Sequence, residues 1–515
     1  MITSRYKPDR ATRAKVMKAL VKAVGPERVS DNPAVLYSYS GTSMGYKKAM
    51  PDFIVRPCTT DEVRKIVSVA RRYQVPLTPV ASGTQEPGTY PWYGGIVLDT
   101  MAMDRIHEIN VEGAYAVIEP GVTMGTLSAE LAHHNLRCTM GSFPPGISAL
   151  GNYLMTAVNS HRSAGPLDDL LGLEAVLADG SVVRTGSRAW SHTYPGTGWH
   201  SPTNGFPNPK QLFIDSAGTL GVVTVGAVRV YSLGETRTMQ AAAFDDYATA
   251  LNFMIRAARG NLVQHICAWH WSLYTTIDHL GVYGQGAPAD ILVHDPWKPP
   301  DERPYIVAVP TIAGFAEHVE AAEKTFARLV RESGGRMWTE ECRKDWPGAW
   351  KFFVDHYCDH VPTNQFMGGY GEGFPMMPIV IADPRKMPEL EQWGLRFLRE
   401  SVLKLGLSYY SHVIDHGRSV FLRMTPFISG ESSQEEMDEA NRTRKHYMEK
   451  AYERYGAVPI RFDPGYKPGE LLARTGPLKN LLRKIKYAID PDNIINPGTS
   501  VAMYGRPPRR RSFKE

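Results

Sequence analysis

A loop rich in glycine, serine and threonine lies between two short apolar segments. It reads Ala-Ser-Gly-Thr-Gln-Glu-Pro-Gly-Thr-Tyr from Ala81 to Tyr90, and the apolar run Ile96 to Asp99 follows it. Successive backbone N–H groups in such a loop form a concavity that binds anions, and glycine lets a ligand approach the backbone closely. We therefore predict a pyrophosphate-binding loop made of Ser82, Gly83, Thr84, Gln85 and Gly88.

Two amphipathic helices are expected to support this loop. Residues 11–24 show apolar side chains at helical spacing with lysines on the opposite face. Residues 59–73 predict a second helix that begins with a capping box of Thr59 and Glu62. The residues expected on the buried faces are Val16, Leu20 and Val21 in the first helix and Val63, Ile66, Val67 and Ala70 in the second.

Further along the chain, short strands alternate with helices, and Val117-Ile118 and Ala175–Leu177 are predicted as buried strands. This pattern favours an α+β fold with helices against mixed sheets. Residues 187–210 are rich in Trp, His, Pro, Gly and Asn, which predicts a long loop that acts as a lid or an interface. From about Gly234 the chain becomes rich in aromatic residues, which indicates a second domain. There His265, Trp269, His270 and Trp271 alternate as in a strand, so one side is expected to line a pocket or the domain core.

Composition excludes several classes of protein. The 515 residues allow two or three domains, and 43% hydrophobic and 22% charged residues are ordinary for a globular protein. The net charge of +5 with no nucleic-acid motif argues against a nucleic-acid partner. Five widely spaced cysteines without a CxxC pair predict no metal cluster and no disulfide framework. Without an apolar leader or a run of about 18 apolar residues, we expect a cytoplasmic protein with no membrane span.

A set of motifs in a fixed order resembles one protein family. These motifs are Pro51–Pro57, the loop at 81–90, Ala116–Thr123, Gly172–Gly180, Gly218–Thr224 and Asp490–Gly498. The set is similar to the FAD-binding domain of the vanillyl-alcohol oxidase and p-cresol methylhydroxylase (PCMH-type) superfamily. The resemblance covers roughly residues 50–235 and the last fifty residues, and it implies an FAD enzyme with a two-part FAD-binding domain. It also implies a cap domain, expected to hold an antiparallel sheet with flanking helices.

The resemblance implies domain boundaries and cofactor contacts. We expect an N-terminal helical segment at 1–49, the FAD-binding domain at 50–235, the cap domain at 236–465 and a returning segment at 466–515. Besides the pyrophosphate loop, the residues implied along FAD are Pro120, Gly121, Ser148, Gly151, Asn152, Gly218, Gly221 and Val223. The pyrophosphate loop holds no histidine, which excludes a covalent link from there. A link through His416 in the cap domain is one alternative, and a hydrogen-bonded structural pair of His416 with Asp415 is the other.

The chemistry implied is oxidoreduction, with a hydride passing from an alcohol-type or benzylic carbon to flavin N5. The leading substrate class is a para-substituted phenol, because residues 110–123 and Gly151–Met155 are similar to that branch. Tyr466 and Lys467 stand where that branch has a Tyr-Arg pair on the phenolate, and Gln85 replaces a second tyrosine. Arg162 is expected to steady the reduced flavin.

The runner-up is a D-2-hydroxy acid dehydrogenase of the glycolate or D-lactate type. The spacing from Gly83 to Gly88 suits that branch. Its members also carry a His-x-Gly-Asp-Gly-Asn-x-His stretch and a later Glu-His-Gly stretch. In this chain His412–Gly417 lacks the second histidine at the required spacing, and the Glu-His-Gly stretch is missing. A substrate carboxylate would need a cation, for which the candidates are Arg162, Arg418, Arg423 and Lys467. A non-redox flavoprotein and a flavin-binding subunit of a larger complex are further alternatives. The electron acceptor is oxygen or a protein such as a cytochrome, and the superfamily favours a homo-oligomer.

Overall fold

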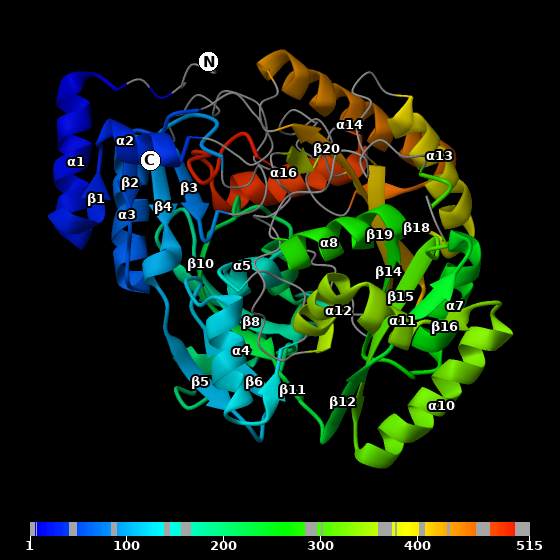
Figure 1. Ribbon diagram of the computed structural model, residues 1–515. Coiled ribbons are helices and arrows are strands. Elements are labelled where there is room, and N and C mark those ends of the chain that lie inside the picture. The colour runs from blue at the N-terminus through cyan, green and yellow to red at the C-terminus, as the bar shows by residue number, and fades with distance from the viewer. Residues whose placement is uncertain are drawn as a thin grey trace.

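The computed structural model describes residues 6, 8–40, 49–83, 90–138, 145–155, 166–283, 296–299, 302–358, 373–375, 378–400, 407–429, 433–459 and 474–499. Figure 1 shows two halves side by side, with the N-terminal elements in blue and cyan on the left and the green to orange elements on the right. The hydrophobic cores divide in the same way. One cluster draws on residues 239–457, whereas two others draw on residues 16–230 together with Ile494 and Ile495 near the C-terminus.

A four-stranded sheet of order β1-β2-β4-β3 begins the left half. Strands β2, β4 and β3 are parallel, and β1 pairs with β2 in antiparallel fashion. All three residues of β2 and all four of β4 are buried, as expected for strands covered on both faces. The elements are β1 (Val29–Ser30), β2 (Phe53–Val55), β3 (Leu77–Val80), β4 (Ile96–Asp99), α1 (Arg10–Val24), α2 (Pro33–Ser38) and α3 (Thr60–Tyr73).

The two predicted helices are present as α1 and α3. The four predicted core residues of α3 are all buried, while in α1 the third buried residue is Val24 and Val21 is only half-buried. The capping box prediction is wrong in one half. Thr59 Oγ1 accepts a hydrogen bond from the Glu62 N–H, but the Glu62 carboxylate accepts from the Cys58 N–H and from Arg28 instead of from Thr59. An ion pair with Arg28 holds the carboxylate away from the cap residue.

A five-stranded antiparallel sheet of order β5-β6-β10-β8-β9 completes the left half, beside a small pair of β7 and β11. The predicted buried residues Val117, Ile118, Ala175 and Val176 fall in β6 and β8, whose residues are all buried. Leu177, which was predicted with them, lies one residue past the end of β8 and is half-buried. The elements are β5 (Ile106–Asn110), β6 (Tyr115–Ile118), β7 (Leu136–Arg137), β8 (Leu170–Val176), β9 (Val182–Arg184), β10 (Val222–Arg229), β11 (Tyr231–Ser232), α4 (Met124–Ala132), α5 (Ala149–Tyr153) and α6 (Pro166–Asp169).

The long loop at 187–210 packs onto this sheet. Its Trp199 is buried in a cluster with Tyr115, Val117, Leu171 and Ala227. A side chain at Gly172 of β8 would come within 3.2 Å of the Trp199 ring, so glycine there makes room for the indole. Hydrogen bonds within the loop, such as Ser187 Oγ to the Gly198 carbonyl at 2.8 Å, hold its shape. The loop therefore covers one face of the sheet.

The right half is built on a ten-stranded antiparallel sheet, counted over the described residues. Its main order is β16-β13-β15-β14-β19-β20-β18-β21, with β12 beside β15 and β17 beside β20. The strands are β12 (Thr236–Met239), β13 (Ala242–Phe244), β14 (His265–His270), β15 (Ile306–Gly314), β16 (Arg336–Met337), β17 (Gly373–Pro375), β18 (Ile379–Ala382), β19 (Leu407–Ile414), β20 (Ser419–Ser429) and β21 (Val458–Pro459).

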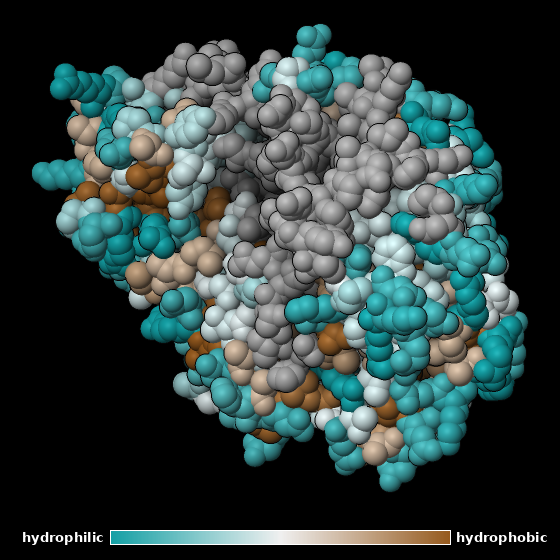
Figure 2. Space-filling view, in the orientation of Figure 1, coloured by the Kyte–Doolittle hydropathy of each residue, from teal (hydrophilic) through white to brown (hydrophobic). Residues whose placement is uncertain are grey.

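Helices cover both faces of this cap sheet, and their outward surfaces are mostly hydrophilic in the view of Figure 2. Strand β14 ends at His270, and Trp271 begins the helix that follows. Of the four residues expected to alternate in a strand, His265, Trp269 and His270 therefore lie in β14 and Trp271 does not. The helices are α7 (Tyr247–Arg259), α8 (Trp271–Tyr283), α10 (Ala316–Glu332), α11 (Thr339–Asp345), α12 (Pro347–Phe353), α13 (Met387–Arg399) and α14 (Gln434–Tyr455), with a π-helical turn at Val354–Cys358.

The C-terminal segment comes back to the left half. Helix α16 (Pro477–Ile489) ends beside β3, where Leu77 and Ile495 form a parallel bridge. The Leu77 N–H donates to the Ile494 carbonyl at 2.8 Å, and the Asn496 N–H donates to the Leu77 carbonyl at 2.7 Å. Two distant parts of the chain thus meet at the strand that leads into the glycine-rich loop.

Candidate functional site

The predicted pyrophosphate loop begins where β3 ends at Val80. Gly83 has φ +65°, a conformation that glycine adopts without strain. The Ser82 hydroxyl oxygen accepts a hydrogen bond from the Ser148 N–H at 3.1 Å, which ties the start of the loop to α5. The remaining predicted loop residues, Thr84, Gln85 and Gly88, lie outside the described residues.

Ser148 joins three of the predicted cofactor-binding segments. Its hydroxyl donates to the Pro120 carbonyl at 2.5 Å and accepts from the Gly151 N–H at 2.9 Å as the N-cap of α5. A side chain at Gly121 would lie 2.4 Å from the Met101 carbonyl oxygen, so this turn requires glycine. Ser82, Pro120, Gly121, Ser148 and Gly151 therefore lie together, although 69 sequence positions separate the first from the last.

Asn152 provides a test of whether this place suits a ligand with hydrogen-bond donors. Its side chain is buried, and its amide nitrogen donates to the Ser148 carbonyl at 3.0 Å. Its Oδ1 has no hydrogen-bond partner in the described part of the chain. A buried acceptor without a donor costs about 1–3 kcal/mol, and a ligand N–H or hydroxyl would remove that cost. The ribityl hydroxyls and ring N–H of FAD fit this requirement.

The predicted turn at Gly218–Val223 lies against β3, the strand that leads into the pyrophosphate loop. Gly218 has φ +68°, and a side chain there would come within 2.8 Å of Pro79 in β3. A side chain at Gly221 would come within 3.0 Å of the Val176 carbonyl. Val223 lies in β10 and pairs with Ala175 of β8. This turn and the pyrophosphate loop are therefore neighbours through β3.

Sequence reasoning missed the residue that holds this turn, Lys486. Its ammonium group is buried and donates to the Asp490 carboxylate at 2.5 Å, the Thr219 carbonyl at 2.7 Å and the Ile495 carbonyl at 2.9 Å. Asp490 also accepts from the N–H groups of Ile494 and Ile495. Burial lowers the pKa of Lys486, and the Asp490 charge opposes that shift. A Lys-x-x-x-Asp spacing at the end of an amphipathic helix was the available signal.

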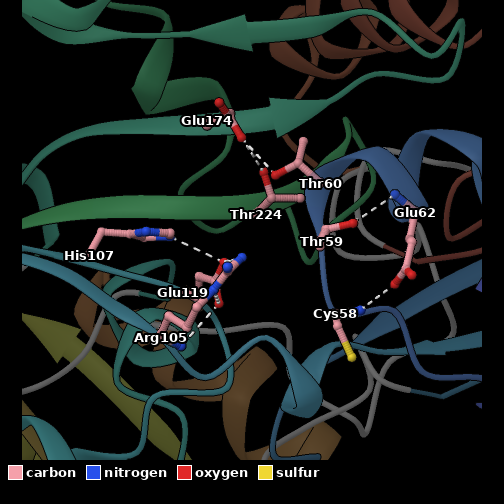
Figure 3. A network of polar contacts seen from close by, with 9 residues as sticks. All are labelled: Cys58, Thr59, Thr60, Glu62, Arg105, His107, Glu119, Glu174 and Thr224. Carbon is pink, nitrogen blue, oxygen red and sulfur yellow. Dashed lines mark hydrogen bonds and ion pairs between the residues drawn. The ribbon is translucent and has the colours of Figure 1, made fainter.

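Two buried carboxylates position neighbouring segments, as Figure 3 shows. Glu119, which precedes the Pro120-Gly121 turn, accepts from the Arg105 side chain at 2.9 Å and lies 3.2 Å from His107 Nε2. Glu174 of β8 accepts from Thr60 at 2.8 Å and from Thr224 at 3.0 Å. The second carboxylate thereby joins α3, β8 and β10. Neither glutamate was predicted, because each of these partners comes from a different element.

The cap sheet has a polar and aromatic face built on β14 and β19. Cys267 pairs with His412 and Trp269 pairs with Tyr410, so these side chains share one face. Cys267 Sγ lies 3.4 Å from His412 Nε2, and the His265 and His412 rings are 5.1 Å apart. Burial and the nearby Arg237 charge lower the pKa of His265 to about 3. Burial is the main cause that lowers the pKa of His412 well below its usual value, and His265 and Arg423 are smaller causes in the same direction. Both imidazoles are therefore neutral near pH 7.

The opposite face of the cap sheet belongs to the same hydrophobic core cluster, which also includes Cys267, Trp269, Phe352 and Phe353. His270 stacks on Tyr409 with ring centroids 4.6 Å apart, and the Glu391 carboxylate of α13 accepts from Tyr305 at 2.8 Å and from Tyr409 at 2.5 Å. Burial raises the pKa of Glu391, although these hydrogen bonds oppose the shift. Of the two open alternatives for this strand, the core is the one that the structure supports, because His270 is buried and both faces of β14 contribute to the core cluster. His265 lies on the other side, where α12 packs through Phe352 and Phe353 on Trp269.

The candidate catalytic residues are not brought together in the described structure. Tyr466, Lys467 and Arg162 lie outside the described residues. Arg418 lies in the turn between β19 and β20 with 82% of its side chain exposed, and it pairs with Asp415 at 2.9 Å. His416 is in the same turn with φ +55°, and a side chain at Gly417 would meet Ile255 of α7 at 3.1 Å. In Figure 1, α7 is on the right, away from β3 and α5.

None of the helices in the described ranges is long and apolar enough to cross a membrane.

Comparison with known proteins assigns part of the left half to an FAD-binding family. Residues 51–186 match the family described as FAD binding domain. The glycolate oxidase subunit GlcD of Bacillus subtilis is 30% identical over 247 residues, which cover 46% of this chain and 48% of that protein. A probable mitochondrial D-lactate dehydrogenase of Danio rerio is 25% identical over 259 residues, 49% of this chain and 50% of that protein.

The chain thus spans about half the length of the curated relatives that it matches. The fold likeness extends over the whole chain. The crystal structure of p-cresol methylhydroxylase with substrate bound superposes with a TM-score of 0.81 at 19% identity, over 97% of this chain and 98% of that one. The matched family model, the residues that meet around Ser148 and the two-part fold lead to one conclusion: residues 51–186 belong to the FAD-binding domain family, in a chain that has the fold of p-cresol methylhydroxylase.

Proposed function

We propose that this protein is an FAD-dependent oxidoreductase that oxidises an alcohol-type or benzylic carbon, with a para-substituted phenol as its substrate class. One observation carries the proposal. The cap sheet holds a buried face of aromatic rings and neutral imidazoles, on the side where α12 packs. In Figure 1, α12 lies nearer the FAD-binding half than α7 and α10 do. When bound, FAD supplies the hydride acceptor at N5. A buried aromatic surface excludes water, which suits hydride transfer from a benzylic carbon.

The chain's own residues have distinct roles in this proposal. Ser82, Ser148 and Asn152 contact the cofactor through hydroxyl and amide groups, because they meet at the end of β3. Tyr466 and Lys467 bind the phenolate, since a cation and a hydroxyl donor both favour the charged oxygen. In this proposal the positive charge of Arg162 stabilises the reduced flavin. For His416, a covalent link and its absence remain the two alternatives.

A D-2-hydroxy acid is the second candidate substrate. It is favoured by the curated relatives, a glycolate oxidase subunit and a D-lactate dehydrogenase. The phenol has the better support in this chain, because an aromatic wall contributes little to binding a small acid such as glycolate. Trp269, for example, stacks on Tyr410 with ring centroids 5.1 Å apart.

An anaerobic titration of the purified yellow protein distinguishes the two. The visible absorbance of the flavin is followed while 4-ethylphenol, D-lactate or glycolate is added. We expect 4-ethylphenol to bleach the flavin and the two acids to leave it oxidised. Bleaching by an acid alone would overturn the phenol assignment. If none of the three compounds reduces the flavin, the oxidoreductase proposal fails and a non-redox role gains support.

A further inference from the structure

Strands β3 and β4 run parallel and end at the same edge of their sheet, where Val80 pairs with Asp99 (Figure 1). The glycine-rich loop leaves from β3 at this edge. Ligands of open α/β sheets bind beyond the carboxyl ends of the parallel strands. Contacts across this edge therefore decide how the chain enters the loop.

Thr100, the residue after β4, makes such a contact. Its hydroxyl donates to the Val80 carbonyl at 3.0 Å, and both residues are buried. The backbone of β4 turns away at this point, because the Met101 N–H donates to the Asp99 carboxylate at 2.9 Å and Thr100–Ala102 forms a short 3-10 turn. The Thr100 side chain thus extends the link between the two strands past the end of β4.

Asp99 fixes the turn that carries Thr100. Its carboxylate is buried and caps the turn through the Met101 N–H. It also accepts from the Tyr39 hydroxyl at 2.7 Å and lies 3.3 Å from Nε of Arg56. Burial and the hydrogen bond to Asp99 raise the pKa of Tyr39, so the phenol keeps its proton and continues to donate. Contacts from three parts of the chain therefore fix the turn on which Thr100 lies.

The loop entry is anchored at two places. Thr100 holds the Val80 carbonyl, and two residues later the Ser82 hydroxyl oxygen accepts from the Ser148 N–H. The predicted pyrophosphate loop, residues 81–90, contains no Lys or Arg. Its backbone N–H groups and hydroxyls therefore have to supply the attraction for a pyrophosphate, and the strength of such dipoles depends on their direction. The direction in which the chain enters the loop is thus important for binding.

We propose that Thr100 is a positioning residue for the pyrophosphate of FAD, because its hydroxyl holds the end of β3 and so orients the N–H groups at the start of the loop. Asp99 and Tyr39 act through it, since they fix the turn on which it lies. The inference rests on the FAD part of the proposed function and deepens it by naming residues that act on the cofactor through the loop. Loss of the hydroxyl should disturb the pyrophosphate and leave the flavin ring in place.

Thr100→Val tests the proposal, since valine keeps the shape of threonine and removes the hydroxyl. Phosphorus NMR of the holoprotein reports the two phosphates of bound FAD, and the visible absorbance bands report the flavin ring. We expect the phosphate resonances to shift in Thr100→Val while the absorbance bands stay as in wild type. The Kd of FAD should rise roughly 10-fold, because the cofactor must order a loop entry that the wild type holds in place. Flavin fluorescence on dilution of the holoprotein measures that change.

Two further variants and a control assign the effect. Thr100→Ser retains the hydroxyl and should restore the wild-type phosphate resonances, with a Kd within about 3-fold of wild type. Tyr39→Phe removes one bond to Asp99, so it should shift the same resonances by less, and it serves as the test if Thr100→Val does not fold. Thr276→Val is the control, because it removes a buried hydroxyl that donates to the Ser272 carbonyl at 2.8 Å within α8 of the cap. It should leave both the resonances and the Kd unchanged.

The outcomes separate this inference from the function on which it rests. Phosphate resonances that match those of wild type in Thr100→Val would overturn the positioning role, even if the variant is less stable. A shift that Thr100→Ser does not reverse, or an equal change in the flavin bands, would show a general disturbance of the domain and would refute the role too. If the wild-type protein holds no FAD, the FAD assignment itself fails. Neither readout depends on turnover, so failure of the substrate assignment would not affect the result.

Discussion

Removal of the Lys486 ammonium group should loosen the FAD site from a distance. Lys486→Met keeps the length of the side chain and removes three hydrogen bonds, to the Asp490 carboxylate and to the carbonyls of Thr219 and Ile495. Two buried carbonyls lose their donor, and a buried carboxylate loses its counter-charge. Breaking a buried ion pair in this way costs about 3–5 kcal/mol. The N–H groups of Ile494 and Ile495 still bind Asp490, which favours the lower end of that range.

We expect the affinity for FAD to change as well as the stability. Thr219 lies in the turn after Gly218, and Ile495 lies beside β3, which leads into the pyrophosphate loop. Lys486→Met should therefore weaken FAD binding as well as lower the free energy of unfolding. Urea unfolding followed by circular dichroism measures the second effect. Flavin fluorescence on dilution of the folded holoprotein measures the first.

A matched control lies on the same helix. Lys484 is exposed on α16, so Lys484→Met should change the free energy of unfolding by no more than about 0.5 kcal/mol. The double variant Lys486→Met with Asp490→Leu removes the unpaired charge and should recover part of the stability. If Lys486→Met unfolds like wild type, the stabilising role is refuted. If it is destabilised but binds FAD with unchanged affinity, the positioning role is refuted.

Three further predictions concern the described site and the cap. Gly121→Ala should abolish FAD retention, because its side chain would lie 2.4 Å from a backbone carbonyl; flavin content after gel filtration is the check, and full occupancy would contradict it. Ser148→Ala should lower the free energy of unfolding by about 1–2 kcal/mol through loss of the α5 cap, as urea titration would show. Acid should destabilise the cap, since burial holds the pKa of His265 and of His270 at about 3 against 6.5 when exposed. The unfolded chain then binds protons first, so stability falls between pH 6.5 and 3 by about 1.4 kcal/mol per pH unit for each imidazole, and a flat profile of tryptophan-monitored unfolding would refute this.

The local sequence pattern alone was sufficient to predict the helices and strands around the predicted FAD site. The periodicity of residues 59–73 placed all four buried residues of α3, and Val117-Ile118 and Ala175 fall in buried strands. These features depend on neighbours within a few positions, which the sequence shows directly. The family motifs predicted the FAD contacts, and the predicted residues Ser82, Pro120, Ser148 and Gly151 lie together in the structure.

Only the tertiary structure decided how those pieces are joined. Glu62 was expected to cap its own helix, but Arg28 from another element binds its carboxylate. Ser148 holds together two loops, and Lys486 is buried although lysine usually lies at the surface.

The cap shows the same division. Its sequence has histidines at alternating positions, but which of them face the core depends on strand pairing, and pairing is a long-range property. The register of Cys267 with His412 put His265 beside Arg237 and His412, whereas His270 points to Tyr409. The sequence by itself indicated the FAD-binding domain and its cofactor, because local motifs carry that information. The contacts of Ser148 and of Lys486, and the side of the cap sheet on which each histidine lies, depended on residues far apart in the chain.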